Sequence, residues 1–250
     1  MSDCILFHCH DTKLQTLESL RLISEQSNLD VYVIYDCTDK EPFKINGYKA
    51  FNFSIEDYIH SGYPLVSEEQ AADIPTPPAN QKILPIYHNP EYACIWFMQV
   101  YPEYRNYWYV EYDVFFNGDW NDFFKLYEDA DEDFLCVALM QYPFKFWVDP
   151  YKKYLPKDIP DENIFRFFGC INRMSRTLLE TLDVEYSSGR SGYYELSVAT
   201  FASFHGLKIA DLNKYGIVYT GMTVGGFNIY KSWTQQFIDN CPNMLFHPIR

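Results

Sequence analysis

Residues 4–36 read CILFHCHDTKLQTLESLRLISEQSNLDVYVIYD, and this stretch decides the fold class. It begins with a short apolar run at 4–8 and closes with a β-branched and aromatic run at 31–35 that ends at Asp36. Between these runs, four apolar residues recur at roughly helical spacing: Leu14, Leu17, Leu20 and Ile23. A buried strand, a helix and a second buried strand at this spacing predict a βαβ unit with a parallel sheet.

The remainder of the chain continues the alternation of strands and helices. Residues 61–90 contain six prolines and little periodicity, which predicts an irregular surface loop. Asn89 and Pro90 then start a helix to about Tyr101 that is apolar nearly all round, hence buried. Further strands are predicted at 106–114, 133–139, 164–171 and 207–212, and further helices after 118–119, at 175–182 and at 193–205. No repeat or composition break interrupts this pattern, so we expect one α/β domain over residues 1–250.

Composition and charge count against several classes of protein. Apolar residues make up 48% of the 250 residues and charged residues 22%, a poor fit to disorder, collagen or coiled coil. The formal net charge is −14, from 20 Lys and Arg against 34 Asp and Glu. A duplex-wrapping nucleic-acid binder normally carries the opposite sign, so we expect no nucleic-acid partner. Aromatic residues, at 19%, supply a large core and leave rings for a groove that binds sugars or bases.

Cysteine usage and apolar runs bear on the location of the protein. The seven cysteines form no C-x-x-C pair, and their number is odd. The opening residues lack a basic segment followed by a long apolar stretch. No apolar run approaches the ~20 residues that a membrane-spanning helix needs. We therefore expect a reduced, cytoplasmic protein without a transmembrane segment, for which peripheral contact with the inner face of a membrane stays open.

The strongest candidate for chemistry is Glu111-Tyr112-Asp113, at the end of the predicted strand 106–114. Glu111 and Asp113 are two residues apart, so their side chains share one face of a strand or of its fraying end. Two like charges in so aromatic a segment are costly, and a divalent metal removes that cost. Mg²⁺ or Mn²⁺ typically takes one or two protein carboxylates, with water and substrate phosphates in the remaining positions. The alternative is a solvated strand end with two surface acids.

The neighbours of this motif carry a resemblance. An acid-x-acid that closes a central strand, after a βαβ unit and before a short helix, is similar to the layout of nucleotide-sugar glycosyltransferases of the GT-A type. The stretch YWYVEYDVFFNGDW (107–120) resembles the D-x-D region of a group of bacterial and fungal glycosyltransferase-like proteins. Further likenesses keep the family's order and cover most of the chain: ILFHCHD (5–11), VYVIYD (31–36), RFFGCINRMSR (166–176), GYYELSVATFASFHGLKIADL (192–212) and NMLFHPIR (243–250).

This resemblance implies a fold and an activity. The fold would be a single GT-A-like, Rossmann-like domain with a central, mostly parallel sheet flanked by helices, in which 1–115 bind the nucleotide sugar and 116–250 bind the acceptor. The activity would be metal-dependent transfer of a hexosyl or N-acetylhexosaminyl group from a nucleotide sugar, expected to be UDP-linked, to a hydroxyl of a glycan or a lipid-linked saccharide. The resemblance further implies a role in cell-surface polysaccharide biosynthesis. Mn²⁺ or Mg²⁺ would neutralise charge on the departing diphosphate.

The resemblance also assigns residues to the metal and the donor. Asp113 would bind the metal directly, and His247, in the LFHPIR tail, would supply a late metal ligand. Glu111 would act through water or hold the ribose. This chain has Glu where the family has its first Asp, a departure that counts against direct binding of the metal by both carboxylates. Asp36 would face the base or the ribose. The first predicted strand ends in His8, Cys9 and His10, and open α/β sheets bind ligands at such strand ends. We therefore expect His8 and His10 to contact the donor.

Glu195 is the candidate general base, since it follows the 187–192 Gly/Ser turn and matches an acid in the GYYE context of the family. In an inverting transfer, the base takes the proton of the acceptor hydroxyl. An acid in the first turn of a helix is explained equally well by the helix dipole. Arg190, on the Gly/Ser turn, is the predicted mobile clamp for the diphosphate. Other basic candidates are Arg173 and Arg176, for which a solvated helix start is the simpler explanation, and Lys231 and Arg250.

Two other functions stay open at this point. One is a catalytically degenerate protein of the same fold that binds a glycan or a nucleotide, suggested by the exchange of Glu for Asp and by a short C-terminus. The other is a metal-dependent nucleotidyl- or phosphotransferase that uses the same acids. The products distinguish them, because sugar transfer releases a nucleoside diphosphate and nucleotidyl transfer releases pyrophosphate.

Overall fold

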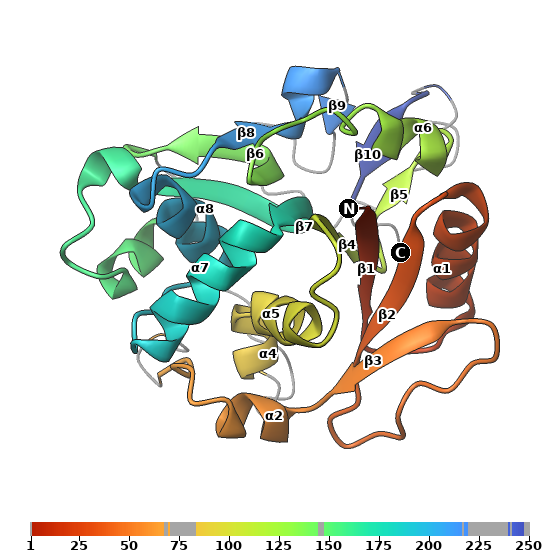
Figure 1. Ribbon diagram of the computed structural model, residues 1–250, viewed down its shortest axis with the longest axis horizontal. Helices are drawn as coiled ribbons and strands as arrows, with labels where there is room; N and C mark the ends of the chain where they lie inside the picture. Colours follow the sequence, from red (N-terminus) through yellow and green to blue (C-terminus); the bar gives the residue numbers. More distant parts are fainter. Residues whose placement is uncertain are drawn as a thin grey trace.

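The computed structural model describes residues 2–67, 70, 84–144, 148–216, 218–219, 240 and 242–247. Most of these residues belong to one seven-stranded sheet and the helices on its two faces (Figure 1). The strands are β1 (Asp3–Cys9), β2 (Asp30–Asp36), β3 (Lys49–Phe53), β4 (Asn106–Glu111), β5 (Phe115–Phe116), β6 (Phe134–Gln141), β7 (Phe165–Ser175), β8 (Ile209–Asp211), β9 (Val218–Tyr219) and β10 (Met244–Phe246). The α-helices are α1 (Leu14–Gln26), α2 (Ile55–His60), α4 (Leu84–His88), α5 (Glu91–Val100), α6 (Trp120–Lys125), α7 (Arg176–Ser187) and α8 (Tyr194–Phe204).

The central sheet has the strand order β3-β2-β1-β4-β7-β6-β8. Strands β3, β2, β1 and β4 pair in parallel, whereas β7 runs antiparallel to both β4 and β6, and β6 pairs in parallel with β8. The predicted βαβ unit is confirmed, because β1 and β2 are parallel and α1 connects them. The fold is therefore the expected α/β type with a mostly parallel sheet.

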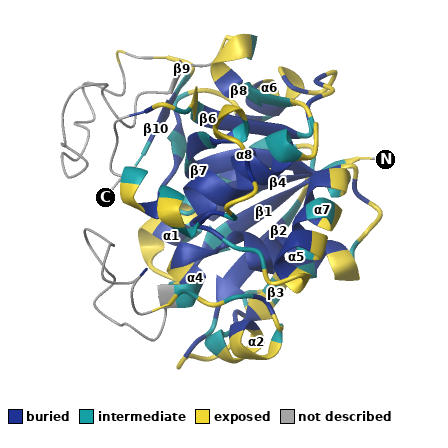
Figure 2. Cartoon of the chain, turned by 90° about the vertical axis from the view of Figure 1, so that its left-hand side faces the viewer, coloured by how far each residue is buried: buried dark blue, intermediate teal, exposed yellow. Residues whose placement is uncertain are grey.

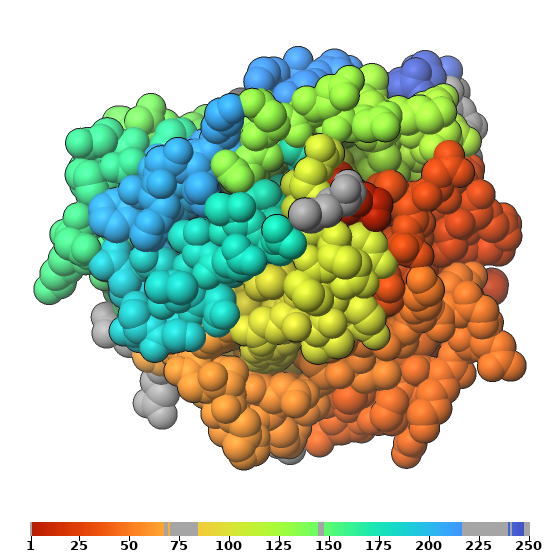
Figure 3. All heavy atoms as spheres, viewed as in Figure 1, coloured from red at the N-terminus to blue at the C-terminus, as the bar shows by residue number. Residues whose placement is uncertain are grey.

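The alternation of side chains along β1 and β2 builds two cores, one on each face of the sheet. Ile5 and Phe7 pack with buried residues of α1 and α6, while Cys4 and Leu6 pack with buried residues of α5, α7 and α8. Figure 2 shows β1, β4, β7 and α8 among the most buried parts of the molecule. On the surface in Figure 3, α5 lies between the N-terminal elements and α7, against which it packs. Both faces are apolar, which is why these strands read as nearly continuous apolar runs.

The carboxyl ends of β1, β2 and β4 meet at one edge of the sheet. The register places His8 of β1 directly opposite Glu111 of β4, and Cys9 of β1 opposite Tyr35 of β2. Asp36, the last residue of β2, therefore lies at the same edge as Glu111. Three of the residues that the sequence assigned to the donor and metal sites are thus brought together by strand pairing alone.

A small second sheet closes this edge. Its strand order is β5-β10-β9, with β10 antiparallel to β5 and parallel to β9. The backbone of Asn117 extends the β5–β10 pairing by a bond from its N–H to the Met244 carbonyl at 3.0 Å and by a bond to its own carbonyl from the Asn243 N–H at 2.7 Å. The sequence patterns did not predict these short strands.

Several local expectations differ from the structure. The strand expected at 106–114 ends at Glu111, and a turn follows it. The N-cap of α5 is Pro90 and not Asn89. The side-chain amide of Asn89 donates to Glu91 Oε1 and to the Gly192 carbonyl, each at 3.0 Å. Within the loop expected at 61–90, residues 84–88 form α4, and 68–69 and 71–83 lie outside the described residues. Lys231 and Arg250, two of the basic candidates, also lie outside them. In the described part of the chain, no helix is both long and apolar enough to span a bilayer.

Candidate active site

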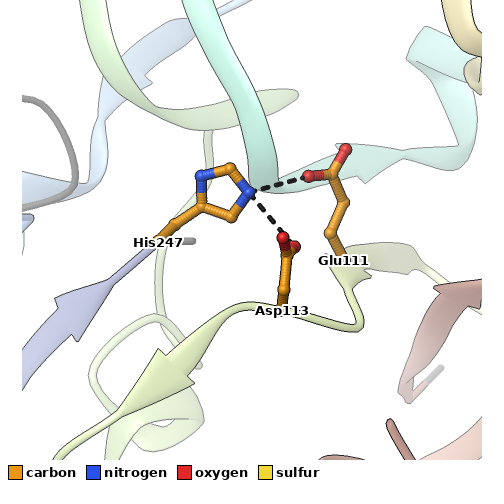
Figure 4. A group of neighbouring side chains, drawn as sticks. All are labelled: Glu111, Asp113 and His247. Carbon is orange, nitrogen blue, oxygen red and sulfur yellow. Dashed lines mark ion pairs between the residues drawn. The ribbon is translucent and has the colours of Figure 1, made fainter. Parts of the chain in front are cut away.

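Three side chains with metal-binding groups converge at the carboxyl end of β4. His247 Nε2 lies 3.2 Å from Glu111 Oε2 and 3.2 Å from Asp113 Oδ1. One donor atom from each of the three residues lies within 4.8 Å of the others, and Figure 4 shows the three side chains pointing toward one another. Among the described residues, they form the one cluster of His, Cys, Asp and Glu with this geometry. We call it the Glu-Asp-His cluster.

The small sheet explains how a residue near the end of the sequence reaches Asp113. Asp113 lies two residues before β5, and His247 directly follows β10. Phe246 of β10 is fully buried and pairs antiparallel with Phe115 of β5. The chain beyond Phe246 is therefore directed back toward Asp113. Burial of the apolar residue before His247 thus fixes the imidazole beside the two carboxylates.

The electrostatics of the Glu-Asp-His cluster favour a bound cation. Burial by itself lowers the pKa of His247, but hydrogen bonds and charges from Asp113 and Glu111 outweigh it and raise that pKa to about 9. The imidazolium compensates one of the two carboxylate charges at neutral pH. The side chains of Asp113 and His247 are only 10% and 13% exposed, so water screens the remaining charge poorly. A divalent cation in place of the proton compensates both carboxylates.

Tyr109 holds Glu111 from within the sheet, and His8 contacts Tyr109. The Tyr109 hydroxyl donates to Glu111 Oε1 at 3.3 Å and lies 3.1 Å from His8 Nδ1. Burial lowers the pKa of His8 to about 4, so this imidazole is neutral. The His8 ring stacks on Phe53 with ring centroids 5.9 Å apart. His8 therefore contacts the group that orients Glu111, a place that the sequence did not indicate for it, and Tyr109 was not among the predicted residues.

Glu195 is in the first turn of α8 and is 6% exposed. Its Oε1 accepts a hydrogen bond from the Gly169 N–H at 2.8 Å, while Oε2 is buried without a partner in the described structure. Burial raises the pKa of Glu195 to about 8, and the charges of Glu111 and His247 act on it in opposite directions. The charges of the Glu-Asp-His cluster therefore act on the Glu195 carboxyl. A poised carboxyl near the reacting groups is what a general base requires.

The other predicted donor residues lie at the same edge. Asp36 is buried, and its Oδ1 accepts a hydrogen bond from the Thr38 N–H at 2.8 Å. His10 is exposed, and its ring meets the Tyr112 ring edge-on at 4.9 Å. The Lys40 ammonium connects the two segments, because it donates to the carbonyls of His10 and Asp36 at 2.7 and 3.3 Å. Binding of a nucleotide by Asp36 and His10 stays a prediction.

Arg190 does not lie with these residues. Its guanidinium is 2.7 Å from Asp158 Oδ2 and 2.5 Å from Glu185 Oε2. It also packs over the ring of Phe204, in the last turn of α8, at 5.3 Å from the ring centroid. Glu195 lies at the opposite end of that helix. The two acids explain why the side chain stays there, and the structure gives the predicted phosphate clamp no support from position.

The two arginines of β7, Arg173 and Arg166, differ in their surroundings. Arg173 is fully buried and donates to the carbonyls of Tyr127, Ala130 and Glu132 at 2.8–3.0 Å, which is a structural role. Arg166 is 6% exposed, and the carboxylates of Glu195 and Asp149 oppose the lowering of its pKa by burial. Arg166 was missed by the sequence analysis, although an arginine at the start of an otherwise apolar strand was the available signal.

Comparisons with known proteins give structural likenesses only. No family model and no curated protein sequence matches the chain. Among solved structures, the chain is similar to the mannosyltransferase Ktr4p from S. cerevisiae (14% identity, TM-score 0.45, covering 84% of this chain and 68% of Ktr4p) and to mouse xyloside xylosyltransferase 1 in its apo form (8%, 0.45, 99% and 97%). It is also similar to the glycosyltransferase GlyE of Streptococcus pneumoniae TIGR4 (10%, 0.44, 100% and 55%). These proteins are all glycosyltransferases. At such low sequence identities, a function for this chain has to be argued from its own site residues.

Proposed function

We propose that this protein is a metal-dependent glycosyltransferase that moves a sugar from a nucleotide sugar, with a UDP-linked sugar as the expected donor, to a hydroxyl of a saccharide acceptor. The observation that carries the proposal is the Glu-Asp-His cluster at the carboxyl end of a central strand. Open α/β sheets bind their ligands at this edge. The acceptor is a glycan or a lipid-linked saccharide, as the family resemblance implies.

The donor atoms of the cluster fit a divalent cation. Ligands that bind one Mg²⁺ or Mn²⁺ at about 2.1 Å in neighbouring positions are roughly 3 Å apart. The 3.2 Å separations of His247 Nε2 from Glu111 Oε2 and from Asp113 Oδ1 match this spacing. The longer Glu111 side chain reaches the same point as Asp113, so we assign all three residues as ligands. An imidazole beside two carboxylates suits Mn²⁺ better than Mg²⁺.

The chain's own residues then divide the work of the transfer. The bound cation would neutralise charge on the leaving diphosphate. Asp36, His8 and His10 line the edge where the nucleotide would bind. The acceptor hydroxyl attacks the anomeric carbon while Glu195 takes its proton. Arg166, on the Glu195 side, adds a buried positive charge near the reacting groups.

Thermal unfolding with Mn²⁺ and a panel of nucleoside diphosphates, alone and together, tests the donor site. A ligand that binds only the folded state raises the midpoint by mass action. At 100 times Kd the gain is about 2.7 kcal/mol, which for a chain of this size corresponds to roughly 5–10 °C. We expect a shift that needs both Mn²⁺ and one nucleoside diphosphate. If no pair shifts the midpoint, a degenerate binding protein becomes the better explanation.

Replacement of the central ligand tests the chemistry. We expect Asp113→Ala to abolish Mn²⁺-dependent release of nucleoside diphosphate from nucleotide sugars while the protein stays folded. Asp122→Ala is the matched control, because Asp122 is an exposed acid on α6 and removes the same charge from the surface. Full activity of Asp113→Ala would remove the metal assignment. Pyrophosphate as the product would instead identify a nucleotidyltransferase.

A further inference from the structure

The backbone of β7 approaches the first turn of α8 closely at Gly169. The Gly169 N–H donates to Glu195 Oε1 at 2.8 Å. A Cβ on this residue would lie 2.4 Å from Cε1 of Tyr194 and 3.2 Å from Glu195 Oε1. Its φ is outside the left-handed region, so any residue is able to adopt this backbone conformation. Space, and not φ, therefore requires glycine here.

The Tyr194 side chain has no room to yield. It is 3% exposed, and its ring lies edge-on to the rings of Tyr109 and Phe167, at 5.9 and 5.1 Å. Its hydroxyl accepts from Asn172 Nδ2 at 2.6 Å and donates to the Gly169 carbonyl at 3.3 Å. A methyl group at position 169 must therefore displace the first turn of α8, which also carries Glu195.

The contact at Gly169 leaves the two oxygens of Glu195 in different states. Oε1 is occupied by the Gly169 N–H, whereas Oε2 is buried and has no hydrogen-bond partner in the described part of the chain. A buried oxygen without a partner is costly in a folded protein. Glu91 Oε2 is likewise buried without a partner there, so it is the convergence of other ionisable groups on Glu195 that favours a catalytic role for its unpartnered oxygen.

We propose that Gly169 is a positioning residue for Glu195, and that it makes Oε2 the oxygen that takes the acceptor proton. This inference rests on the proposed function. In the transfer, the acceptor O–H bond breaks and an O–H bond forms at Glu195 Oε2. The acceptor oxygen bonds to the anomeric carbon, and the bond from that carbon to the diphosphate breaks, with the electron pair leaving on the nucleoside diphosphate. The hydrogen bond from the Gly169 N–H keeps Oε1 from taking part in this proton transfer.

The kinetic test compares Gly169→Ala, Tyr194→Leu and the double variant. The readout is Mn²⁺-dependent release of nucleoside diphosphate from UDP-glucose, UDP-galactose and GDP-mannose. A displacement of about 1 Å costs on the order of 100-fold in rate, so we expect Gly169→Ala to lower kcat by about that factor, with KM within about twofold. Leucine at 194 removes the ring edge that a Cβ meets. The double variant should therefore recover about tenfold over Gly169→Ala, a rescue that general destabilisation does not produce.

Amide hydrogen exchange at position 169, followed by NMR, tests the contact without any substrate. We expect slow exchange in the wild type and at least tenfold faster exchange in Glu195→Ala and in Gly169→Ala. If kcat of Gly169→Ala equals that of an active wild type, or if the Gly169 amide is unprotected, the positioning role is wrong. If the wild type turns over no nucleotide sugar, the proposed function fails, and the inference about the transfer fails with it. The exchange data then still decide whether the Gly169–Glu195 contact exists.

Discussion

Glu91 and Glu195 are two buried acids in nearly the same local setting. Each is in the first turn of an apolar helix, α5 and α8 respectively, and each has one tyrosine as an immediate chain neighbour. Glu91 is fully buried and Glu195 is 6% exposed. Burial raises the pKa of Glu91 to about 7 and that of Glu195 to about 8. Neither depth nor pKa therefore distinguishes a structural acid from a catalytic one.

The surroundings of the two carboxylates separate them. Glu91 Oε1 accepts from the Tyr186 hydroxyl at 2.6 Å and from Asn89 Nδ2 at 3.0 Å, so neutral side chains hold it within the core. Glu195 is held by one backbone N–H, and charged groups act on it from the Glu-Asp-His cluster and from Arg166. A perturbed pKa indicates function when other ionisable groups converge on the same point.

The largest expected contrast is in activity. Glu195→Gln removes the base while keeping the shape and the acceptor oxygen for the Gly169 N–H, so we expect kcat to fall by about 10²–10⁴-fold. Glu91→Gln is the matched control, an identical change at a buried position outside the site, and kcat should stay within about twofold. Release of nucleoside diphosphate from nucleotide sugars measures both. Equal losses in the two variants would contradict the distinction.

The next contrast is in the pH dependence of stability. Glu91 has a pKa of about 7 in the folded state, against an ordinary value of 4.5, because burial favours the neutral form. Below pH 4.5 both states hold the proton. Between about pH 4.5 and 7 the unfolded chain loses it while the folded chain keeps it, so stability falls as pH rises. The loss is of order 3 kcal/mol, since one pKa unit corresponds to about 1.4 kcal/mol.

Glu91→Gln removes this dependence and preserves the oxygen that Tyr186 and Asn89 contact. We therefore expect the free energy of unfolding of the variant, relative to wild type, to rise between pH 5 and 8. Urea unfolding at several pH values gives this difference, and subtraction cancels Glu195 and every other titrating group. A difference that stays constant with pH would mean that Glu91 is ionised or solvated in the folded protein.

The fold was predictable wherever a segment is long enough to show its period. The stretch 4–36 predicted β1, α1 and β2, because alternating faces of two parallel strands are both buried. Strands β5, β9 and β10 have only two or three residues each, which is too short for any periodicity. The β5–β10 pairing joins residues about 130 positions apart in sequence, and β9 pairs with β10 at a separation of 26, so no local pattern carries that information.

The candidate site was predictable where a motif or a family likeness names the residue. Glu111, Asp113 and His247 were predicted in this way, and the structure places them together. The contacts that support the site were not predicted: Tyr109 was not singled out as a partner of Glu111, and Gly169 reaches Glu195 only through tertiary packing of α8 on β7. Arg190 shows a limit of the same kind, and its role as a clamp stays a prediction. A basic residue on a Gly/Ser turn suggests a mobile clamp, but Glu185 and Asp158, the latter more than thirty positions away in sequence, bind it.

The smallest expected effect concerns two tyrosine hydroxyls. The Tyr109 hydroxyl donates to Glu111, and the Tyr186 hydroxyl donates to Glu91. Tyr109→Phe removes the bond to Glu111 Oε1, and loss of a partner that orients a metal ligand typically costs 10–100-fold in metal affinity. At 3.3 Å this bond is long, so we expect a loss of about tenfold in Mn²⁺ affinity by titration calorimetry. Tyr186→Phe should leave Mn²⁺ affinity unchanged and lower the free energy of unfolding by about 1 kcal/mol.

Tyr107→Phe is the matched control for Tyr109→Phe, because Tyr107 is on the same strand but its hydroxyl donates to the Tyr101 carbonyl, away from Glu111. Unchanged Mn²⁺ binding in Tyr109→Phe would mean that His247 and Asp113 alone orient the cation, with Glu111 acting through water. A loss in Tyr109→Phe that Tyr107→Phe does not share would make Glu111 a direct ligand held by its neighbour. The two tyrosine hydroxyls then differ in what they support. The Tyr109 hydroxyl supports a metal ligand at the edge of the sheet, and the Tyr186 hydroxyl supports a neutral acid in the core.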